Sequence, residues 1–593
     1  MSNKKIIFLF FISISLVITG CDLFNFDKPR TPEQFFAVQS GDTYVTVMWG
    51  NVEDADTYTV SWSENPNSTV INRASREFDA LGLAAQTVRL NNTDFSSGKT
   101  FYFWVYSQNI RGTSVISRSE KVSFSVPKSW TIMVWLDGDN TLDDAAKVDF
   151  HEMEAGLFAA QQKDSDIMAN LNIIVQYDGR YGNYGRFEVQ PRDINPDFDE
   201  SNPSYGKISG GLSTEPNMGD AGELKNFIEY TKERYDTDYY ALILWNHGGG
   251  VRSLQADSSS REICEDTTDN DILYIGEIKD VLDVGDSVDF LGMDACLMGM
   301  TEIAYEFRPG TGDFGAQTMT FSPANEQVDG WEYDRILYRL SGSSVIESAG
   351  YGGDLCYNIS YLSPEDLAII VAKEYQDAFY ELPYETQTAV DLTKIVVVKA
   401  AIDELSGMLA RDPTYKDAVE IIRGSKSDGS ELMHYFDISS AFEWGNYASF
   451  DLYDFAWRIR DSIDCSFPSD IQDQAESLMF AIEDAIIYSW AGSGYNEDGL
   501  NPEDWENGLS IFFPDGDADA PNPDNSYTYW TYQYFYSSLP NSVISTWAGN
   551  TGLNYGAIDF CTGDADSIVE GWFELLQSWY NNTEGTLHPG PMF

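Results

Sequence analysis

The chain has 593 residues, with 95 Asp or Glu against 36 Lys or Arg, so its formal net charge is −59. Hydrophobic residues make up 43% and aromatic residues 14%, which is enough apolar material for packed cores and excludes an intrinsically disordered acidic chain. The charge also excludes nucleic acid as a partner, because binding a phosphate backbone relies on clustered Lys and Arg. A surface this acidic instead favours basic peptides and divalent cations.

The amino terminus resembles the signal peptide of a bacterial lipoprotein. Two lysines precede an apolar stretch at 6–18, which is too short to span a membrane but fits a secretory h-region. Small residues then lead to Cys21, and the resemblance implies that this cysteine is lipidated and becomes the first mature residue. We therefore expect a signal peptide at 1–20, a tether at 21–30, and an exported protein anchored to a membrane on the periplasmic side or the cell surface. An ordinary signal peptide with an incidental cysteine is the alternative.

Residues 31–127 have the alternating pattern of a small antiparallel β domain. Three sets of residues each share a face: Val45, Val47 and Trp49; Tyr58, Val60 and Trp62; Tyr102, Trp104 and Tyr106. The segments around Trp49 and Tyr102 resemble a fibronectin type III module, which implies that Trp49 is a core tryptophan and Tyr102 a corner tyrosine. A spacer and an adhesion module are both open as its role.

From residue 128 to 593 the pattern changes to near-continuous apolar runs separated by amphipathic stretches. Such runs occur at Thr131–Leu136, Leu171–Val175, Ala241–Trp245 and Val288–Met293. They predict a mostly parallel sheet covered by helices on both faces, with functional groups at the carboxyl ends of the strands. We expect a catalytic core at about 128–345 and a carboxyl-terminal part at about 346–593, whose strands the pattern does not assign.

His247 and Cys296 each lie within three residues of the end of one of these apolar runs. A cysteine thiol is mostly protonated at neutral pH, and a neighbouring imidazole can take its proton and later donate a proton to a leaving amine. The backbone N–H groups of Gly248 and Cys296 are the expected oxyanion donors, because both lie in turns beyond the strands. An inert buried thiol and a structural histidine form the alternative.

The segments at 130–140, 245–249, 294–298 and 508–514 resemble a clostripain-like cysteine peptidase of the caspase-type superfamily. The resemblance covers the chain from about residue 130 onward. It implies that His247 is the catalytic base and Cys296 the nucleophile of an endopeptidase that cuts after Arg or Lys. It also implies activation by cleavage between the His and Cys strands, for which Arg261 is the candidate site.

Three acidic residues are candidates for binding a basic substrate residue. Asp294 lies two positions before Cys296, so on a strand the two side chains point to the same face. Its carboxylate could bind Arg or Lys, or could instead cap the turn through backbone amides. Glu326 and Asp329, which follow the next strand, are the second candidates.

No cofactor is required for this chemistry, and calcium is the one metal that the resemblance implies. Asp515, Asp517 and Asp519 begin like a calcium loop that lacks its glycine and glutamate, and Asp137, Asp139, Asp143 and Asp144 form a second acidic group. In a chain this acidic, a solvated acidic surface loop is the favoured explanation of each group.

The expected function is therefore a lipid-anchored cysteine endopeptidase acting on proteins or peptides. An inactive peptidase-like binding or adhesion lipoprotein is the first alternative, and a cysteine hydrolase of a non-peptide bond is the second. Besides Cys21 and Cys296, four cysteines remain in an oxidising compartment, and no CxxC pair suggests structural zinc.

Overall fold

The protein is described here by a computed structural model in which the chain forms two compact units. The described residues are 28–32, 35–83, 85–194, 212–251, 263–341, 357–423, 435, 449–461, 467–496, 508–513, 555, 558–562 and 568–580. The units divide between Lys128 and Ser129, and residues 339–361 group with the first unit. Cys21, Arg261 and the acidic repeat at 515–519 lie outside the described residues. No helix in the described part is both long and apolar enough to cross a membrane.

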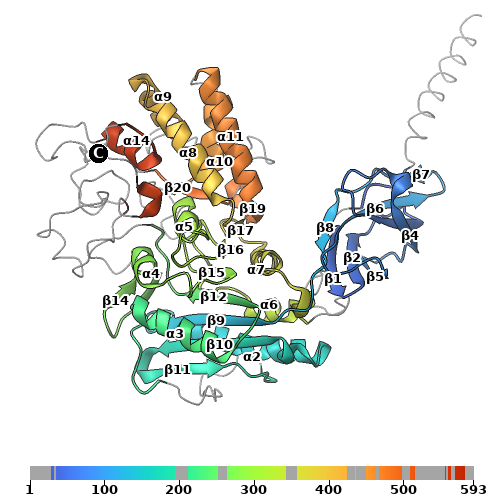
Figure 1. Cartoon of the computed structure of the whole chain (residues 1–593), viewed down its shortest axis with the longest axis horizontal. Helices are drawn as coiled ribbons and strands as arrows, with labels where there is room; N and C mark the ends of the chain where they lie inside the picture. The colour runs from blue at the N-terminus through green and yellow to red at the C-terminus, as the bar shows by residue number, and fades with distance from the viewer. Residues whose placement is uncertain are drawn as a thin grey trace, which may run out of the picture. The chain divides into compact units, whose positions relative to one another are not determined.

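The first unit is a sandwich of two antiparallel sheets (Figure 1). One sheet has the order β1-β2-β5, with β1 (Phe36–Gly41), β2 (Tyr44–Gly50) and β5 (Ala85–Asn91). The other has the order β4-β3-β6-β7, with β8 also paired to β6; its strands are β3 (Thr57–Ser63), β4 (Ala74–Asp79), β6 (Thr100–Asn109), β7 (Gly112–Thr113) and β8 (Glu120–Ser123).

In this sandwich β2 and β3 bury the faces that the alternating pattern predicts, whereas β6 buries the opposite face. Trp49 is fully buried and contacts Tyr58 with their ring centroids 5.3 Å apart. On β6, however, the core face is made by Phe101, Phe103 and Val105 rather than by the alternate set that includes Tyr102. Both faces of β6 are rich in aromatic residues, so hydrophobic alternation alone does not distinguish them.

Residue 357 and its neighbours return to the first unit after the chain has entered the second. Tyr357 packs against Val38 and Met48, and the backbone N–H of Lys128 donates to the carbonyl of Ser360 at 2.7 Å. The Tyr361 hydroxyl donates to Asp42 at 2.9 Å.

The second unit is built on an eight-stranded sheet of order β11-β10-β9-β12-β15-β16-β17-β19 (Figure 1). Strands β10, β9, β12, β15 and β16 are parallel, whereas β11, β17 and β19 run antiparallel to their neighbours. The bounds are β9 (Trp130–Gly138), β10 (Leu171–Gly179), β11 (Asn183–Glu188), β12 (Tyr239–Trp245), β15 (Phe290–Asp294), β16 (Thr318–Phe321), β17 (Thr386–Asp391) and β19 (Ile486–Ala491).

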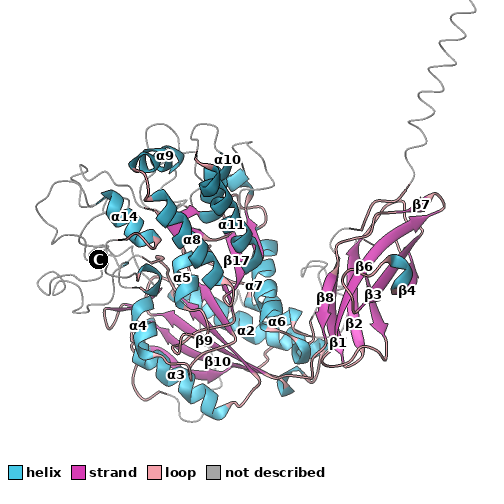
Figure 2. Ribbon diagram, turned by 45° about the horizontal axis from the view of Figure 1, so that its top comes forward, coloured by secondary structure: helices cyan, strands magenta, loops and turns pink. Residues whose placement is uncertain are grey.

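Helices cover both faces of this sheet, which is why its central strands are apolar on both sides (Figure 2). The helices on one face are α2 (Asp143–Lys163), α6 (Tyr333–Arg339) and α7 (Pro364–Phe379). Those that share the core of the other face are α3 (Ala221–Arg234), α4 (Ile275–Val281), α5 (Thr301–Glu306) and α8 (Ile395–Leu409). The α/β class with a mostly parallel sheet, preceded by a small all-β sandwich, is therefore confirmed.

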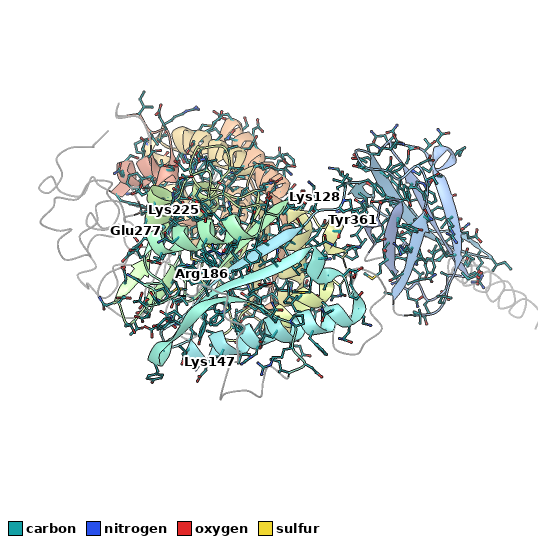
Figure 3. The ribbon with its side chains drawn as sticks, turned by 60° about the horizontal axis from the view of Figure 1, so that its bottom comes forward. Lys128, Lys147, Arg186, Lys225, Glu277 and Tyr361 are labelled. Carbon is teal, nitrogen blue, oxygen red and sulfur yellow. The ribbon has the colours of Figure 1, made fainter. Side chains whose placement is uncertain are left out.

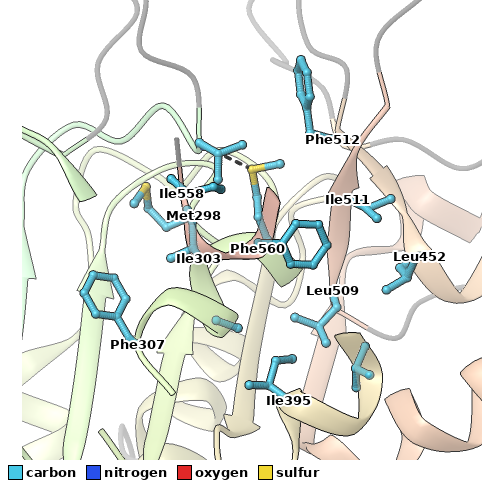
Figure 4. Close-up of a cluster of buried hydrophobic side chains, with 14 of the residues drawn as sticks. Met298, Ile303, Phe307, Ile395, Leu452, Leu509, Ile511, Phe512, Ile558 and Phe560 are labelled. Atoms are coloured by element: carbon cyan, nitrogen blue, oxygen red, sulfur yellow. Dashed lines mark hydrogen bonds between the residues drawn. The ribbon is translucent and has the colours of Figure 1, made fainter. Parts of the chain in front are cut away.

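The carboxyl-terminal part adds helices and short strands beside α5. They are α9 (Pro413–Arg423), α10 (Leu452–Asp461), α11 (Ser469–Ala485), α14 (Trp572–Tyr580), and the pair β18 (Ser449–Asp451) and β20 (Ser510–Phe512). Side chains of β20 such as Ile511 lie in the same apolar cluster as Ile303 of α5 and Phe307, which directly follows that helix (Figure 4). Two buried glutamates of α5 fix this contact: Glu302 accepts from Phe512 N at 2.8 Å, and Glu306 from Phe560 N at 2.9 Å.

Candidate active site

His247 and Cys296 lie at equivalent positions beyond two neighbouring parallel strands. Trp245 of β12 pairs in register with Asp294 of β15, and each candidate residue comes two positions after one member of this pair. The Asn246 N–H donates to the Asp294 carbonyl at 3.2 Å, which continues the ladder by one more step. Both side chains lie at the carboxyl-terminal edge of the sheet, and both are partly exposed.

The two loops that follow these strands pack backbone against backbone. A Cβ atom added at Gly248 would overlap the carbonyl oxygen of Cys296 and lie 3.0 Å from its nitrogen. Leu297, directly after the cysteine, has φ of 63°, an uncommon left-handed conformation for a leucine. Its N–H donates to the Ala324 carbonyl at 2.8 Å, which holds this sharp turn against the loop after β16.

The sulfur of Cys296 lies against the backbone of Glu326. The Glu326 N–H donates to Sγ at 3.3 Å, and Sγ lies 3.9 Å from the Glu326 carbonyl oxygen. An N–H donor directed at sulfur stabilises a thiolate. Cys264 and Cys561 are also free thiols, but both are buried, so Cys296 is the accessible thiol among the described residues.

Thr141, which follows β9, contacts the candidate histidine. Its Oγ1 lies 2.9 Å from Nε2 of His247 and fixes one ring nitrogen. Asn246, the residue before the histidine, is held by Asp137: its side-chain amide donates to the Asp137 carbonyl at 3.2 Å and also to the Asp137 carboxylate. The loops after β9 and β12 are thus joined by hydrogen bonds through buried polar groups.

Asp294 is buried behind Cys296 in an acidic group with Glu326 and Asp149. Its Oδ2 accepts from the Tyr333 hydroxyl at 2.9 Å and from the Trp331 N–H at 3.3 Å. Burial raises the pKa of Asp294, and burial followed by the nearby Asp294 raises that of Glu326. Burial likewise raises the pKa of Asp149, which accepts from Trp245 Nε1 at 2.6 Å. A cationic group that entered here would meet carboxyl oxygens without a hydrogen-bond partner among the described residues, namely Asp149 Oδ1 and Glu326 Oε2.

The remaining predicted residues lie in different surroundings. Asp329 is exposed on the loop after β16, and the side chain of Glu326 turns inward to accept from Trp331 Nε1 at 3.2 Å. Thr141 and Asp149 were not among the expected site residues. Thr141 lies in the loop after β9 and Asp149 in the following helix α2, and only their contacts with His247 and Trp245 reveal them.

A second acidic group lies at the same edge of the sheet. Asp139, Glu215 and Asp266 each offer an oxygen, and these oxygens lie within 4.8 Å of one another. Of the aspartates expected to gather near this edge, Asp143 instead pairs with Lys147 at 2.8 Å. Burial, followed by the charges of Asp266, Glu215 and Asp139, raises the pKa of the nearby Asp178 to about 9.

Two comparisons with known proteins point to one family. The family model described as the clostripain family matches residues 134–548. Clostripain of Hathewaya histolytica is 33% identical over 486 residues, which cover 76% of this chain and 87% of that protein.

Two solved structures of bacterial proteases are also similar to the chain. An inactive zymogen C11 protease from Parabacteroides distasonis is 19% identical, with a TM-score of 0.45 over 65% of this chain and 92% of that one. A secreted C11 cysteine protease from Bacteroides thetaiotaomicron, solved with an irreversible peptide inhibitor, is 17% identical, with a TM-score of 0.43 over 67% and 95%.

Proposed function

This chain belongs to the clostripain family of cysteine peptidases and is a cysteine endopeptidase, and on that premise we propose that Cys296 is its nucleophile and His247 its general base and acid. The observation that supports the assignment best is their matched position, each two residues beyond the paired Trp245 and Asp294. The N–H of Glu326 directed at the sulfur is a further support, because it favours the thiolate.

The reaction follows from these positions. His247 takes the thiol proton, and the sulfur of Cys296 attacks the carbonyl carbon of the scissile peptide bond. The backbone N–H groups of Gly248 and Cys296 stabilise the oxyanion. The imidazolium then protonates the leaving amine, and water, deprotonated by the same histidine, hydrolyses the thioester.

Thr141 is a positioning residue in this proposal. Its hydroxyl holds Nε2 of His247 at 2.9 Å, which assigns Nδ1 to proton exchange with Cys296. A ring held in one orientation reaches the transition-state geometry without searching among rotamers.

We assign the substrate preference to basic residues at the position before the cut. The support is the concentration of carboxyl groups near the sulfur: Asp294 is buried, the carboxylate of Glu326 turns inward to Trp331, and Asp329 is exposed on the same loop as Glu326. A guanidinium or ammonium group of a substrate would complement this charge.

Export, anchoring and self-processing complete the proposal. The segments at 1–20 and 21–30 act as lipoprotein signal and tether, and Cys21 bears the lipid. Residues 31–127 form a fibronectin type III-like module that precedes the peptidase domain at 128–593. Cleavage after Arg261 separates the His-bearing and Cys-bearing parts of the chain.

The decisive experiment is covalent labelling with a peptidyl acyloxymethylketone. We expect a probe with Arg or Lys before the reactive ketone to modify Cys296, identified by mass spectrometry of tryptic peptides, and a matched probe with Glu to react far more slowly. Cys296→Ala and His247→Ala should abolish labelling, whereas Cys264→Ala, which removes a buried thiol, should not. Labelling of Cys296→Ala at the wild-type rate would refute the assignment of the nucleophile.

Self-processing is tested on the same samples. Wild type should separate into two chains on a denaturing gel, while Cys296→Ala and Arg261→Ala should each remain one chain. Wild type that persists as one active chain would refute cleavage at Arg261 as a step in activation.

A further inference from the structure

Three large apolar side chains are exposed at one end of the β sandwich. Ile110 is 94% exposed, Leu81 63% and Leu83 53%. Ile110 lies in the turn between β6 and β7, and the two leucines lie in the loop between β4 and β5. A single exposed apolar residue is ordinary, whereas several at one place mark a contact surface. We call these three residues the apolar tip.

Strand register places the two loops at the same end of the sandwich. Thr57 of β3 pairs with Asp79 of β4 on one side and with Gln108 of β6 on the other. Leu81 comes two residues after the first of these partners, and Ile110 comes two residues after the second. The β6–β7 turn and the β4–β5 loop therefore leave the sheet side by side, at the end where β7 lies in Figure 2.

Hydrogen bonds to the loop before β3 hold both parts of the apolar tip. The carbonyl of Asp56 accepts from the Ala80 N–H at 3.0 Å, and its carboxylate accepts from the Ile110 N–H at 3.1 Å. The Leu81 N–H donates to the side chain of Gln86 at 3.3 Å. The backbone of the tip is thus fixed while its apolar side chains stay exposed.

The amino-terminal segment of the described chain runs to the same end. The Thr31 hydroxyl donates to the Val115 carbonyl at 3.1 Å, beyond β7. Three residues earlier, Lys28 lies against the β6–β7 turn: a Cβ atom added at Gly112, which pairs with Asn109, would be 3.1 Å from Lys28 Cε. Followed from Thr31 back to Lys28, the chain therefore approaches the apolar tip.

The length of chain before Lys28 limits how far the tip lies from an anchor at Cys21. Cys21 precedes Lys28 by seven residues. Seven residues of fully extended chain span at most about 25 Å. A lipid on Cys21 therefore holds the tip close to the bilayer surface. Tethering raises the effective concentration of a contact, so even a contact that is weak in free solution forms.

The connections to the second unit leave from the other end of the sandwich. The Tyr361 hydroxyl donates at 2.9 Å to Asp42, in the turn between β1 and β2. Tyr44, which follows this turn, pairs with Asn91 at the end of β5 that is remote from the β4–β5 loop. Lys128 donates to the carbonyl of the residue before Tyr361, and both are labelled in Figure 3. The apolar tip is thus remote from the points where the chain joins the peptidase unit.

The charge of the chain is unevenly divided between its two parts. Residues 28–127 contain nine Lys or Arg and ten Asp or Glu, whereas residues 128–593 contain 25 and 83. The sandwich is therefore nearly neutral and is not repelled from a lipid surface. At the tip, the exposed Arg111 is balanced by Glu53 and Asp54 on the neighbouring loop. The contact that suits this end is apolar, with a zwitterionic bilayer.

We propose that the apolar tip inserts into the interface of the bilayer that holds the lipid on Cys21, an inference that rests on the proposed lipidation. Burial of Ile110, Leu81 and Leu83 among the headgroups and upper acyl chains removes apolar surface from water. The acyl chains supply most of the affinity. The tip fixes the orientation of the sandwich, with its connections to the peptidase unit directed away from the lipid.

The test maps which residues meet lipid in two tethered forms of the protein. Vesicles of phosphatidylcholine contain a small fraction of phosphatidylcholine with a photoreactive diazirine in its acyl chain, and adducts are located by mass spectrometry. Both forms carry Cys296→Ala to prevent self-cleavage. One is the full chain, exported and lipidated by a bacterial host. The other is residues 21–593 with Cys21→Ser and an amino-terminal histidine tag, held on the vesicles by a nickel-chelating lipid.

The two forms separate failure of this inference from failure of the proposed lipidation. An unmodified Cys21 in the first form would refute lipidation, while the second form still holds the tip beside the bilayer. Each form is also made with Ile110→Asp and with Ile71→Asp. Ile71→Asp is the matched control, because Ile71 is likewise 94% exposed but lies between β3 and β4, at the other end of the sandwich.

We expect lipid adducts on the peptide that contains Leu81 and Leu83 in both forms. Ile110→Asp should lower their yield at least fivefold, because the tip no longer inserts, and Ile71→Asp should leave the yield within about twofold. Raising the salt from 0.1 M to 1 M should also leave it within about twofold, since salt screens charges and does not weaken apolar burial. No adducts at the tip of the histidine-tagged form, an equal yield in Ile110→Asp, or loss of the adducts at high salt would overturn the proposal.

Discussion

Replacing Gly248 with Ala tests whether the close approach of the two loops sets the reactive geometry. The added Cβ would overlap the Cys296 carbonyl oxygen and lie 3.0 Å from both the Cys296 nitrogen and the Ala295 Cβ. Neither neighbour is the flexible end of a side chain, so the overlap is relieved only by moving backbone. Restoring an ordinary C···O separation of about 3.3 Å requires a shift of roughly 1 Å.

That shift separates the histidine and cysteine loops directly. A displacement of about 1 Å in a catalytic arrangement costs about 100-fold in rate, which corresponds to about 2.7 kcal/mol of transition-state stabilisation. The same overpacking should lower the free energy of unfolding by only about 1–3 kcal/mol. We therefore expect Gly248→Ala to fold and to have kcat/KM reduced by about two orders of magnitude.

The assay is kcat/KM on a peptide with Arg before the cut, normalised to the concentration of folded enzyme, beside thermal melting. Gly315→Ala is the matched control, because its Cβ would meet the backbone oxygens of Arg308 and Phe307 at 2.8 and 3.1 Å, at the opposite end of β16. It should lose comparable stability but keep its kcat/KM within about threefold. Unchanged kcat/KM in Gly248→Ala, or an equal loss in Gly315→Ala, would refute the reasoning.

Thr141→Val should lower kcat about tenfold, because one hydrogen bond of about 1.4 kcal/mol no longer orients His247. Thr141→Ser keeps the hydroxyl and should restore kcat, and failure of the serine to do so would contradict a positioning role. Asp294→Asn should reduce kcat/KM for peptides with Arg before the cut by about 100-fold and leave a norleucine analogue little changed, whereas equal losses on both would count against substrate binding by this carboxylate. Burial raises the pKa of Glu302 to about 7, above its value in an unfolded chain, so the stability it contributes is fully present below about pH 4.5 and is lost as the pH rises through 7. Urea denaturation of wild type should then show about 2.5 kcal/mol more loss between pH 5 and pH 8 than that of Glu302→Gln, and parallel losses would disprove it.

The central sheet was predictable because each of its buried strands is indicated by a pattern within a single short segment of the sequence. Strands buried on both faces need continuous apolar runs, so the runs ending at Leu136, Val175, Trp245 and Met293 each correspond to a parallel strand of the structure. The same logic placed His247 and Cys296 at one edge. By contrast, β17 reads Thr-Gln-Thr-Ala-Val-Asp and offers no such run, so the antiparallel end of the sheet was left unassigned.

The contacts around the candidate site were not predictable, because they join segments far apart in the chain. Asp139 and Asp266 are 127 positions apart yet face the same space, whereas Asp143, close to Asp139 in sequence, turns away to Lys147. Likewise, the core face of β6 depended on which of two aromatic sets meets the opposite sheet. Which acidic residues meet, and which face of β6 is buried, is decided by tertiary packing. The spacing of residues along one strand therefore does not reveal it.

The return of residues 357–361 to the first unit means that two separate stretches of the chain build the amino-terminal unit. The chain passes between the units at 128–129, at 338–339 and again at 361–362, so after a nick in the first of these linkers residues 1–128 would still be held by non-covalent contacts with residues 357–361. Deleting everything before Ser129 would strip Tyr357 of Val38 and Met48 and leave an apolar side chain bare to water. An enzyme cut at this linker would therefore keep its β sandwich until those contacts also broke.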